Sequence, residues 1–109
     1  MDLNRNFGFK HGFSGTELDD KCSDVFGGHK AFTARESRAM RDYVEGLPKT
    51  PILGVDIHSY SNVLLYPYGY KKDVFPDNVE EIKRLGDKAV KAVKGMTTKP
   101  AAELGRETA

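Results

Sequence analysis

Apolar residues concentrate in one stretch near the middle of the chain, residues 52–70. The stretch is rich in β-branched and aromatic residues and is interrupted once, by a polar corner that begins at His58. This pattern predicts a buried strand over Ile52–Ile57, a turn, and a second strand over Val63–Tyr66 that stops at Pro67. Open α/β sheets tend to carry chemistry where a buried strand ends beside a hydroxyl-rich turn. Taken alone, however, a histidine in that place is more often structural than a ligand.

Two further stretches repeat apolar residues at three- and four-residue steps, which indicates amphipathic helices. The first spans residues 33–47 and the second residues 77–95. In a capping box, the first side chain and a glutamate three residues later satisfy free N–H groups of the first turn. Such boxes are expected for Thr33 with Glu36 and for Asp77 with Glu80. Both apolar faces are expected to cover the sheet.

These elements predict an α/β fold, with a partial mixed sheet flanked by the two amphipathic helices. Residues 1–32 are glycine-rich and aperiodic, which predicts a loop-rich segment, and the polar residues 96–109 predict a loose tail. At 109 residues the chain is one domain at most. An unpaired apolar edge of such a sheet predicts poor solubility or self-association.

Composition excludes several classes of function. The net charge is +1, from 17 basic and 16 acidic residues, which gives no basis for a nucleic-acid partner. A hydrophobic content of 39% is enough for a modest core and argues against wholesale disorder. No apolar run is long enough to span a membrane, and polar Asp2 follows Met1 where a secretory signal would continue.

The segment Asp-Leu-Asn-Arg-Asn-Phe, residues 2–7, holds the other candidate chemistry. An arginine presents a planar fork of donors that matches a carboxylate in two parallel hydrogen bonds, and an asparagine can add an amide donor. Arg5 alone would be an ordinary solvated charge. Together with His-Ser-Tyr-Ser at 58–61 and Leu-Leu-Tyr-Pro-Tyr-Gly-Tyr at 64–70, this segment resembles the zinc metallocarboxypeptidases of the digestive A/B type. The resemblance extends to about Val93, with the two motifs in the expected order and separation.

The resemblance implies a role for five residues. Asn4 and Arg5 would clamp the terminal carboxylate of a peptide substrate, and His58 would be one of three protein ligands of a catalytic zinc. Ser59 and Tyr60 correspond to a corner that lines the substrate cleft, and the peptide bond in that corner is cis without a proline. The implied fold is a three-layer α/β carboxypeptidase domain, of which this chain would form the central part.

Other parts of the family's machinery are expected to lie outside these residues. The first two zinc ligands come from a His-x-x-Glu motif, and neither His11 nor His29 begins one. The general-base glutamate would follow the last residue here. Asp2 matches a position that supports a zinc-bound histidine. Cys22, the single cysteine, matches one that pairs with a cysteine further upstream, although a cysteine without a role is an equally good interpretation.

The sequence therefore predicts a segment of a zinc metallocarboxypeptidase that removes C-terminal residues from peptides, inactive as an isolated chain. The family is typically secreted, which predicts an extracellular protein, although no export signal is present in this sequence. The alternative is a non-enzymatic truncated product, or a weak module that binds peptide carboxylates.

Overall fold

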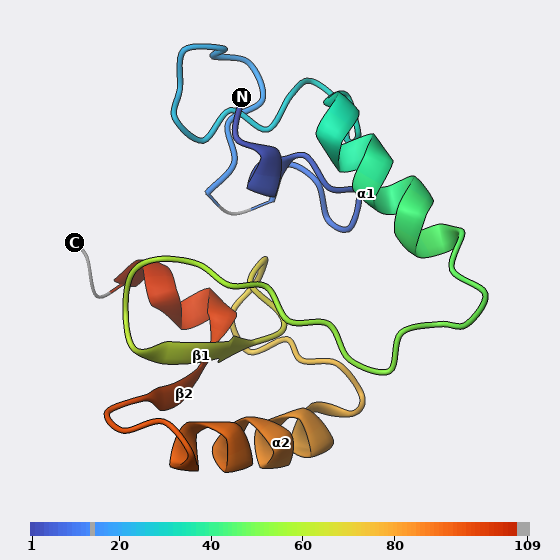
Figure 1. Ribbon diagram of the computed structural model, residues 1–109. Coiled ribbons are helices and arrows are strands. Elements are labelled where there is room, and N and C mark those ends of the chain that lie inside the picture. Colours follow the sequence, from blue (N-terminus) through green and yellow to red (C-terminus); the bar gives the residue numbers. More distant parts are fainter. Residues whose placement is uncertain (14, 107–109) are drawn as a thin grey trace. The chain divides into compact units, whose positions relative to one another are not determined.

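The computed structural model describes residues 1–13 and 15–106, which form two compact units, Met1–Asp56 and Ile57–Ala109. The elements follow in the order η1 (a 3₁₀ helix, Leu3–Arg5), α1 (Arg35–Glu45), β1 (Val63–Tyr66), α2 (Val79–Lys91), β2 (Thr97–Pro100) and η2 (a 3₁₀ helix, Ala101–Arg106) (Figure 1). Two α-helices and a two-stranded parallel sheet confirm the predicted α/β class. In the described part of the chain, no helix is long and apolar enough to cross a bilayer.

The second unit is a β1–α2–β2 arrangement. Parallel strands need a crossover connection, and α2 provides it. Leu64 of β1 lies opposite Thr98 of β2, and a Cβ placed on Gly86 of α2 would lie 3.3 Å from a methyl group of each. Gly86 is buried, so α2 covers this face of the sheet closely. The Tyr66 ring is buried on the same strand and lies 6.3 Å from the ring of Phe75.

Strand β1 begins and ends where the apolar pattern predicted, but the expected loose tail is wrong. Thr97–Pro100 form β2 and the residues after them form η2, while residues 107–109 lie outside the described part of the chain. The four residues of β2 show no apolar alternation. They become a strand because the edge of β1 offers unpaired backbone N–H and C=O groups for a parallel ladder.

The predicted buried strand over Ile52–Ile57 is also wrong. These residues form no strand with any described residue. They are also exposed, with Ile52 at 103%, Val55 at 77% and Ile57 at 89%. A strand is defined by hydrogen bonds to a neighbouring backbone, and apolar β-branched residues do not make one by themselves.

The predicted capping boxes do not form. Helix α1 begins at Arg35 after Ala34, which supplies no side-chain cap. The N–H of Ala34 instead donates to Asn6 Oδ1 over 3.0 Å, and Thr33 Oγ1 accepts from Asn6 Nδ2. A side chain distant in sequence thus takes the place of the local cap.

Helix α2 begins at Val79, two residues later than expected, and its N-cap Asn78 makes no side-chain cap bond. Glu80 accepts a hydrogen bond from Lys83 Nζ over 3.0 Å. The helix ends at Lys91, and the chain then turns through Gly95, whose φ of +80° suits glycine.

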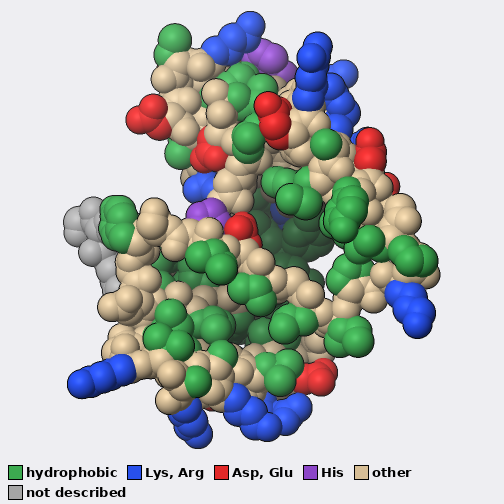
Figure 2. Space-filling model, viewed as in Figure 1, with side chains coloured by type: hydrophobic (Ala, Val, Ile, Leu, Met, Phe, Trp, Pro, Cys, Tyr) green, Lys and Arg blue, Asp and Glu red, His purple; other side chains and the backbone are tan. Residues whose placement is uncertain are grey.

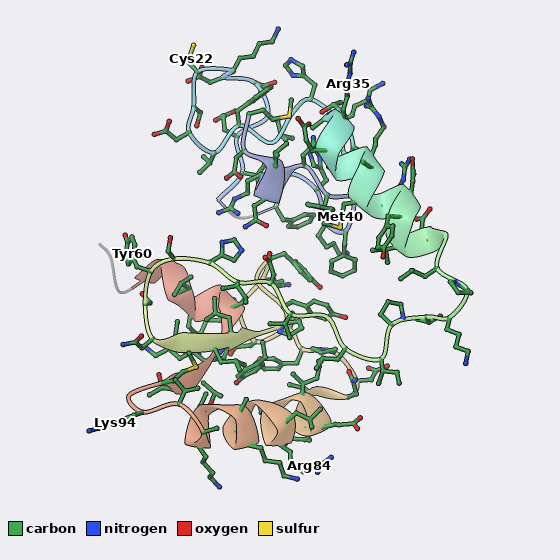
Figure 3. The ribbon with its side chains drawn as sticks, in the orientation of Figure 1. Cys22, Arg35, Met40, Tyr60, Arg84 and Lys94 are labelled. Atoms are coloured by element: carbon green, nitrogen blue, oxygen red, sulfur yellow. The ribbon has the colours of Figure 1, made fainter. Side chains whose placement is uncertain are left out.

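The first unit consists of loops and α1 arranged around buried polar side chains. Asn6 is 0% exposed and Ser37 is 2% exposed. Among the described residues of this unit, Phe26 is the one large apolar residue that is buried. On α1, Met40 is 55% exposed (Figure 3) and Tyr43 is 69% exposed. The expected contact of this apolar face with the sheet stays a prediction, because the sheet belongs to the second unit. Figure 2 shows other hydrophobic side chains at the surface.

Candidate functional site

Asn4 and Arg5 lie together on η1, a single tight turn. Asp2 begins the turn, and its Oδ1 accepts from the N–H of Asn4 over 2.9 Å. The N–H of Asp2 donates to the carbonyl of Phe26 over 2.8 Å, and the N–H of Arg5 donates to the carbonyl of Asp2 over 3.1 Å. These bonds hold the backbone of both candidate clamp residues against the rest of the first unit.

The Arg5 guanidinium is anchored at one nitrogen. Its Nε donates to the carbonyl of Gly15 over 3.0 Å, and Asp2 Oδ2 lies 3.9 Å from the same nitrogen. The side chain is 35% exposed, and its two terminal nitrogens donate to no group among the described residues. Those nitrogens form one edge of the guanidinium fork, which can meet a carboxylate in two parallel hydrogen bonds.

Two glycines lie directly beneath this turn. A Cβ on Gly27 would lie 2.6 Å from the Arg5 carbonyl oxygen and 3.1 Å from Arg5 Cβ. Gly28 has a φ of +82°, and a Cβ there would lie 2.5 Å from Thr33 Oγ1 and 2.8 Å from Asn6 Nδ2. This part of the segment predicted to be rich in loops therefore forms a tightly packed support for Arg5.

Asn6 is a buried polar residue of this region that the sequence pattern missed. Its Nδ2 donates to the Gly27 carbonyl over 2.6 Å, the Lys30 carbonyl over 3.1 Å and Thr33 Oγ1 over 2.8 Å. Its Oδ1 accepts from the Ala34 N–H and from Ser37 Oγ. The only sequence signal was its place beside Asn4 and Arg5, because an asparagine in a polar, aperiodic segment is ordinarily exposed.

His58, Ser59 and Tyr60 lie together in an exposed corner of the second unit, ahead of β1. The Ser59–Tyr60 peptide bond is cis, as the resemblance implied, and so is the Pro67–Tyr68 bond. The Tyr60 side chain is 90% exposed and projects from the chain (Figure 3). Because Asn4 and Arg5 belong to the first unit, the union of the two groups in one site stays a prediction.

His58 does not complete a metal site with the described residues. A catalytic zinc needs three protein ligands and an open position, and no group of three His, Cys, Asp or Glu side chains in residues 1–13 and 15–106 lies close enough to hold an ion. His11 Nε2 lies 3.1 Å from the Gly27 carbonyl oxygen, and the His29 ring makes an edge contact with Phe26 at 5.3 Å. We therefore assign no zinc-dependent step to the described residues.

Cys22 is an exposed free thiol at the surface of the first unit (Figure 3). Its pairing with an upstream cysteine stays a prediction.

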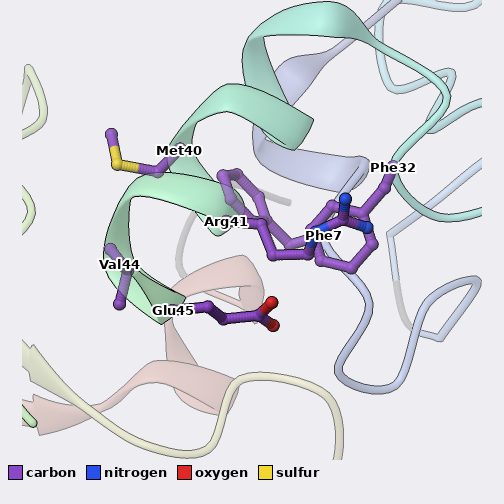
Figure 4. Close-up of a pocket in the computed structure, with 6 residues that line it drawn as sticks. All are labelled: Phe7, Phe32, Met40, Arg41, Val44 and Glu45. Carbon is purple, nitrogen blue, oxygen red and sulfur yellow. The ribbon is translucent and has the colours of Figure 1, made fainter. Parts of the chain in front are cut away.

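A shallow, mainly apolar depression lies beside α1 (Figure 4). The Arg41 guanidinium carbon lies 4.8 Å from the centre of the Phe32 ring, a cation–π contact, and the Phe7 and Phe32 rings meet edge to face at 6.0 Å. The lining residues are Phe7, Phe32, Met40, Arg41, Val44 and Glu45. None of them is a predicted site residue.

Comparison with known proteins decides the family. A profile of the peptidase M14 family, zinc carboxypeptidase, matches residues 1–108. The chain belongs to this family. It is 38% identical over 92 residues to zinc carboxypeptidase A 1 of Drosophila melanogaster, covering 84% of this chain and 21% of that protein. It is 36% identical over 93 residues to human carboxypeptidase A1, covering 85% and 22%.

Some relatives of this chain are named as inactive metallocarboxypeptidases. The inactive metallocarboxypeptidase ECM14 of Blastomyces gilchristii is 33% identical over 98 residues, covering 86% of this chain and 16% of that protein. The chain thus spans between about a sixth and about a fifth of the length of these relatives. Membership confirms the resemblance read from residues 2–7 and 58–70 and implies zinc in complete enzymes of the family.

Proposed function

We propose that Asn4 and Arg5 bind the C-terminal carboxylate of a peptide. The observation that carries this proposal is the state of the Arg5 side chain, which is oriented through Nε while its two terminal nitrogens have no partner among the described residues. An arginine held at one nitrogen loses less freedom when it binds an anion. Each charge-assisted hydrogen bond to the carboxylate would contribute about 1.5–3 kcal/mol, less in proportion to solvent screening at this partly exposed side chain.

The complete protein is proposed to be a zinc carboxypeptidase that removes C-terminal residues from peptides outside the cell. Family membership and the motif at residues 58–61 support this. In that protein His58 would be one zinc ligand, and Ser59 and Tyr60 would line the cleft beside the bound peptide. No step of hydrolysis is assigned to the residues here, because one histidine does not make a catalytic zinc site.

A second function is a peptide-carboxylate binder without catalysis. Relatives named as inactive metallocarboxypeptidases, at an identity close to that of the carboxypeptidases A, favour it. The 109 residues alone are expected to behave in this way, whichever function the complete protein has.

The proposal is tested by titrating the 109-residue chain with an N-acetylated dipeptide and, separately, with its C-terminal amide. Binding is followed by nuclear magnetic resonance at the Arg5 Nε–H signal. We expect the acid to bind and the amide to bind at least tenfold more weakly, because the amide offers no charge to the guanidinium. The same samples are assayed for release of the terminal residue, and none is expected.

Arg5→Gln removes the charge and the fork, so it should abolish the preference for the acid. Arg84→Gln is the matched control, because Arg84 is an exposed arginine on α2. Equal affinity for acid and amide, or an unchanged preference in Arg5→Gln, would rule out the clamp.

A further inference from the structure

We propose that Asn6 is a positioning residue that holds Arg5 in place for carboxylate binding and acts through Gly27. The proposal rests on the function proposed for Arg5. Asn6 adjoins Arg5 in the sequence, yet its side chain turns away from the surface and is fully buried, while the Arg5 side chain is 35% exposed. Its role is therefore to support the turn, since it cannot contact the peptide.

The first step is the set of hydrogen bonds from Asn6 to the segment that follows Phe26. The Nδ2 group shares its two hydrogens among the Gly27 carbonyl, the Lys30 carbonyl and Thr33 Oγ1, at 2.6–3.1 Å. These carbonyls lie in or beside a buried region, where a lost partner costs more than the bond itself contributes. The amide group of Asn6 thus determines where Gly27 lies.

The second step is the contact between Gly27 and Arg5. There is no room for even one methyl group between them, because a Cβ on Gly27 would lie 2.6 Å from the Arg5 carbonyl oxygen. Backbone atoms in such close contact move together. Displacement of Gly27 therefore shifts the backbone from which the Arg5 side chain extends.

The third step is the backbone of Asn6 itself. Its N–H donates to the Leu3 carbonyl over 3.0 Å and closes η1, and its carbonyl accepts from the Phe32 N–H over 2.7 Å. A change in the Asn6 side chain thus acts on the turn with Arg5 from both sides, through the backbone and through Gly27.

Ser37 provides a matched control within the same buried network. Its Oγ donates to Asn6 Oδ1 over 2.6 Å and lies 3.1 Å from the Ala34 carbonyl, and the residue is 2% exposed. Ser37→Ala removes a buried hydrogen bond but leaves the three Nδ2 bonds in place. A purely structural role for the network predicts similar effects of both substitutions on peptide binding.

The test compares Asn6→Asp with Ser37→Ala in the 109-residue chain. Asn6→Asp keeps the shape of the side chain but replaces the donor with an oxygen that faces two carbonyls. We expect affinity for the N-acetylated dipeptide acid to fall at least tenfold in Asn6→Asp and to stay within about twofold in Ser37→Ala. We also expect at least tenfold faster solvent exchange of the Arg5 Nε–H in Asn6→Asp alone, because the bond to Gly15 loosens.

Unchanged affinity in folded Asn6→Asp, or an equal loss in Ser37→Ala, overturns the proposal. If Asn6→Asp does not fold, Gly27→Ala replaces it, since a methyl group there displaces Arg5 while the Asn6 side chain stays intact. A folded Gly27→Ala with wild-type affinity also overturns it. If the wild-type chain does not bind the acid, the clamp proposal fails, whereas exchange of the Arg5 Nε–H still decides whether Asn6 holds that side chain.

Discussion

Single side chains, more than an apolar core, organise the loops of the first unit. The side-chain amide of Asn6, directly after η1, binds the Gly27 carbonyl and the N–H of Ala34 at the start of α1. The sequence identified Asn4 and Arg5 as candidates because their chemistry is visible in the residue types. It gave no sign that Asn6 is buried, since burial of an asparagine depends on partners that are 21 to 31 residues away.

Glu17 organises a second loop and makes it sensitive to pH. Its Oε1 accepts from the N–H groups of Leu18 and Asp19 over 2.8 Å and of Asp20 over 3.4 Å. These bonds, that of Asp19 foremost, hold the pKa of Glu17 below its ordinary value of 4.5. The folded loop therefore binds the proton less readily than the unfolded chain does. Its stabilisation is present above pH 4.5 and is lost as the pH falls through the lowered pKa.

We expect the amide signals of Leu18, Asp19 and Asp20 to move together as the pH is lowered below the ordinary pKa of a glutamate. Glu17→Gln should remove that shared transition, because an amide oxygen does not titrate. Independent transitions of the three amides, or a midpoint above the ordinary value, would contradict this account.

At the scale of elements, the packing of α2 on the sheet depends on the close contact of Gly86 with the two strands. Gly86→Val would place branched carbons against Leu64 and Thr98, which already lie 3.3 Å from the position of a Cβ. We expect a loss of about 1–3 kcal/mol in the free energy of unfolding, as is typical of overpacking, measured by urea denaturation.

The control for Gly86→Val is Ala89→Val, at an exposed position of the same helix. It adds a branched side chain without a clash and should cost about 0.5 kcal/mol through helix propensity. Similar losses of unfolding free energy in both variants would show that Gly86 does not pack closely against Leu64 and Thr98.

The elements also show where sequence patterns succeed. Val63–Tyr66 was predicted with its correct bounds, because four apolar residues end at Pro67, a residue that cannot extend the ladder. Ile52–Ile57 is also mainly apolar but forms no strand with the described residues. The two helices were predicted from their periodicity, but their first turns were not. A capping box is a local option, and at α1 the tertiary contact from Asn6 replaced it.

At the scale of the whole chain, the unusual property is the amount of exposed apolar surface. Ile52, Leu53, Val55 and Ile57 are all at least 71% exposed in one continuous segment that belongs to no helix or strand of the described residues. Such a segment offers apolar side chains to another chain. The predicted tendency to self-associate therefore has a definite candidate segment.

We expect the 109-residue chain to associate as its concentration rises and the double variant Val55→Lys, Ile57→Lys to remain monomeric, as measured by sedimentation velocity. Lysine in place of these exposed apolar side chains removes the surface that another chain would cover. Val25→Lys is the control, since Val25 is an exposed valine of the first unit. A wild-type chain that stays monomeric at every concentration, or an equal effect of Val25→Lys, would show that residues 52–57 do not drive association.

The sequence by itself determined the family, the α/β class, the two helices, strand β1 and the residues whose chemistry suits a carboxylate or a metal. These follow from the residue types and from the periodicity of apolar residues, both of which can be read from neighbouring positions in the sequence. Only the tertiary structure decided that Thr97–Pro100 pairs with β1, that Ile52–Ile57 does not pair, and that Asn6 and Gly27 lie beneath Arg5. The physical reason is that a strand or a buried polar group is stabilised by partners that are remote in sequence, so no local pattern contains them.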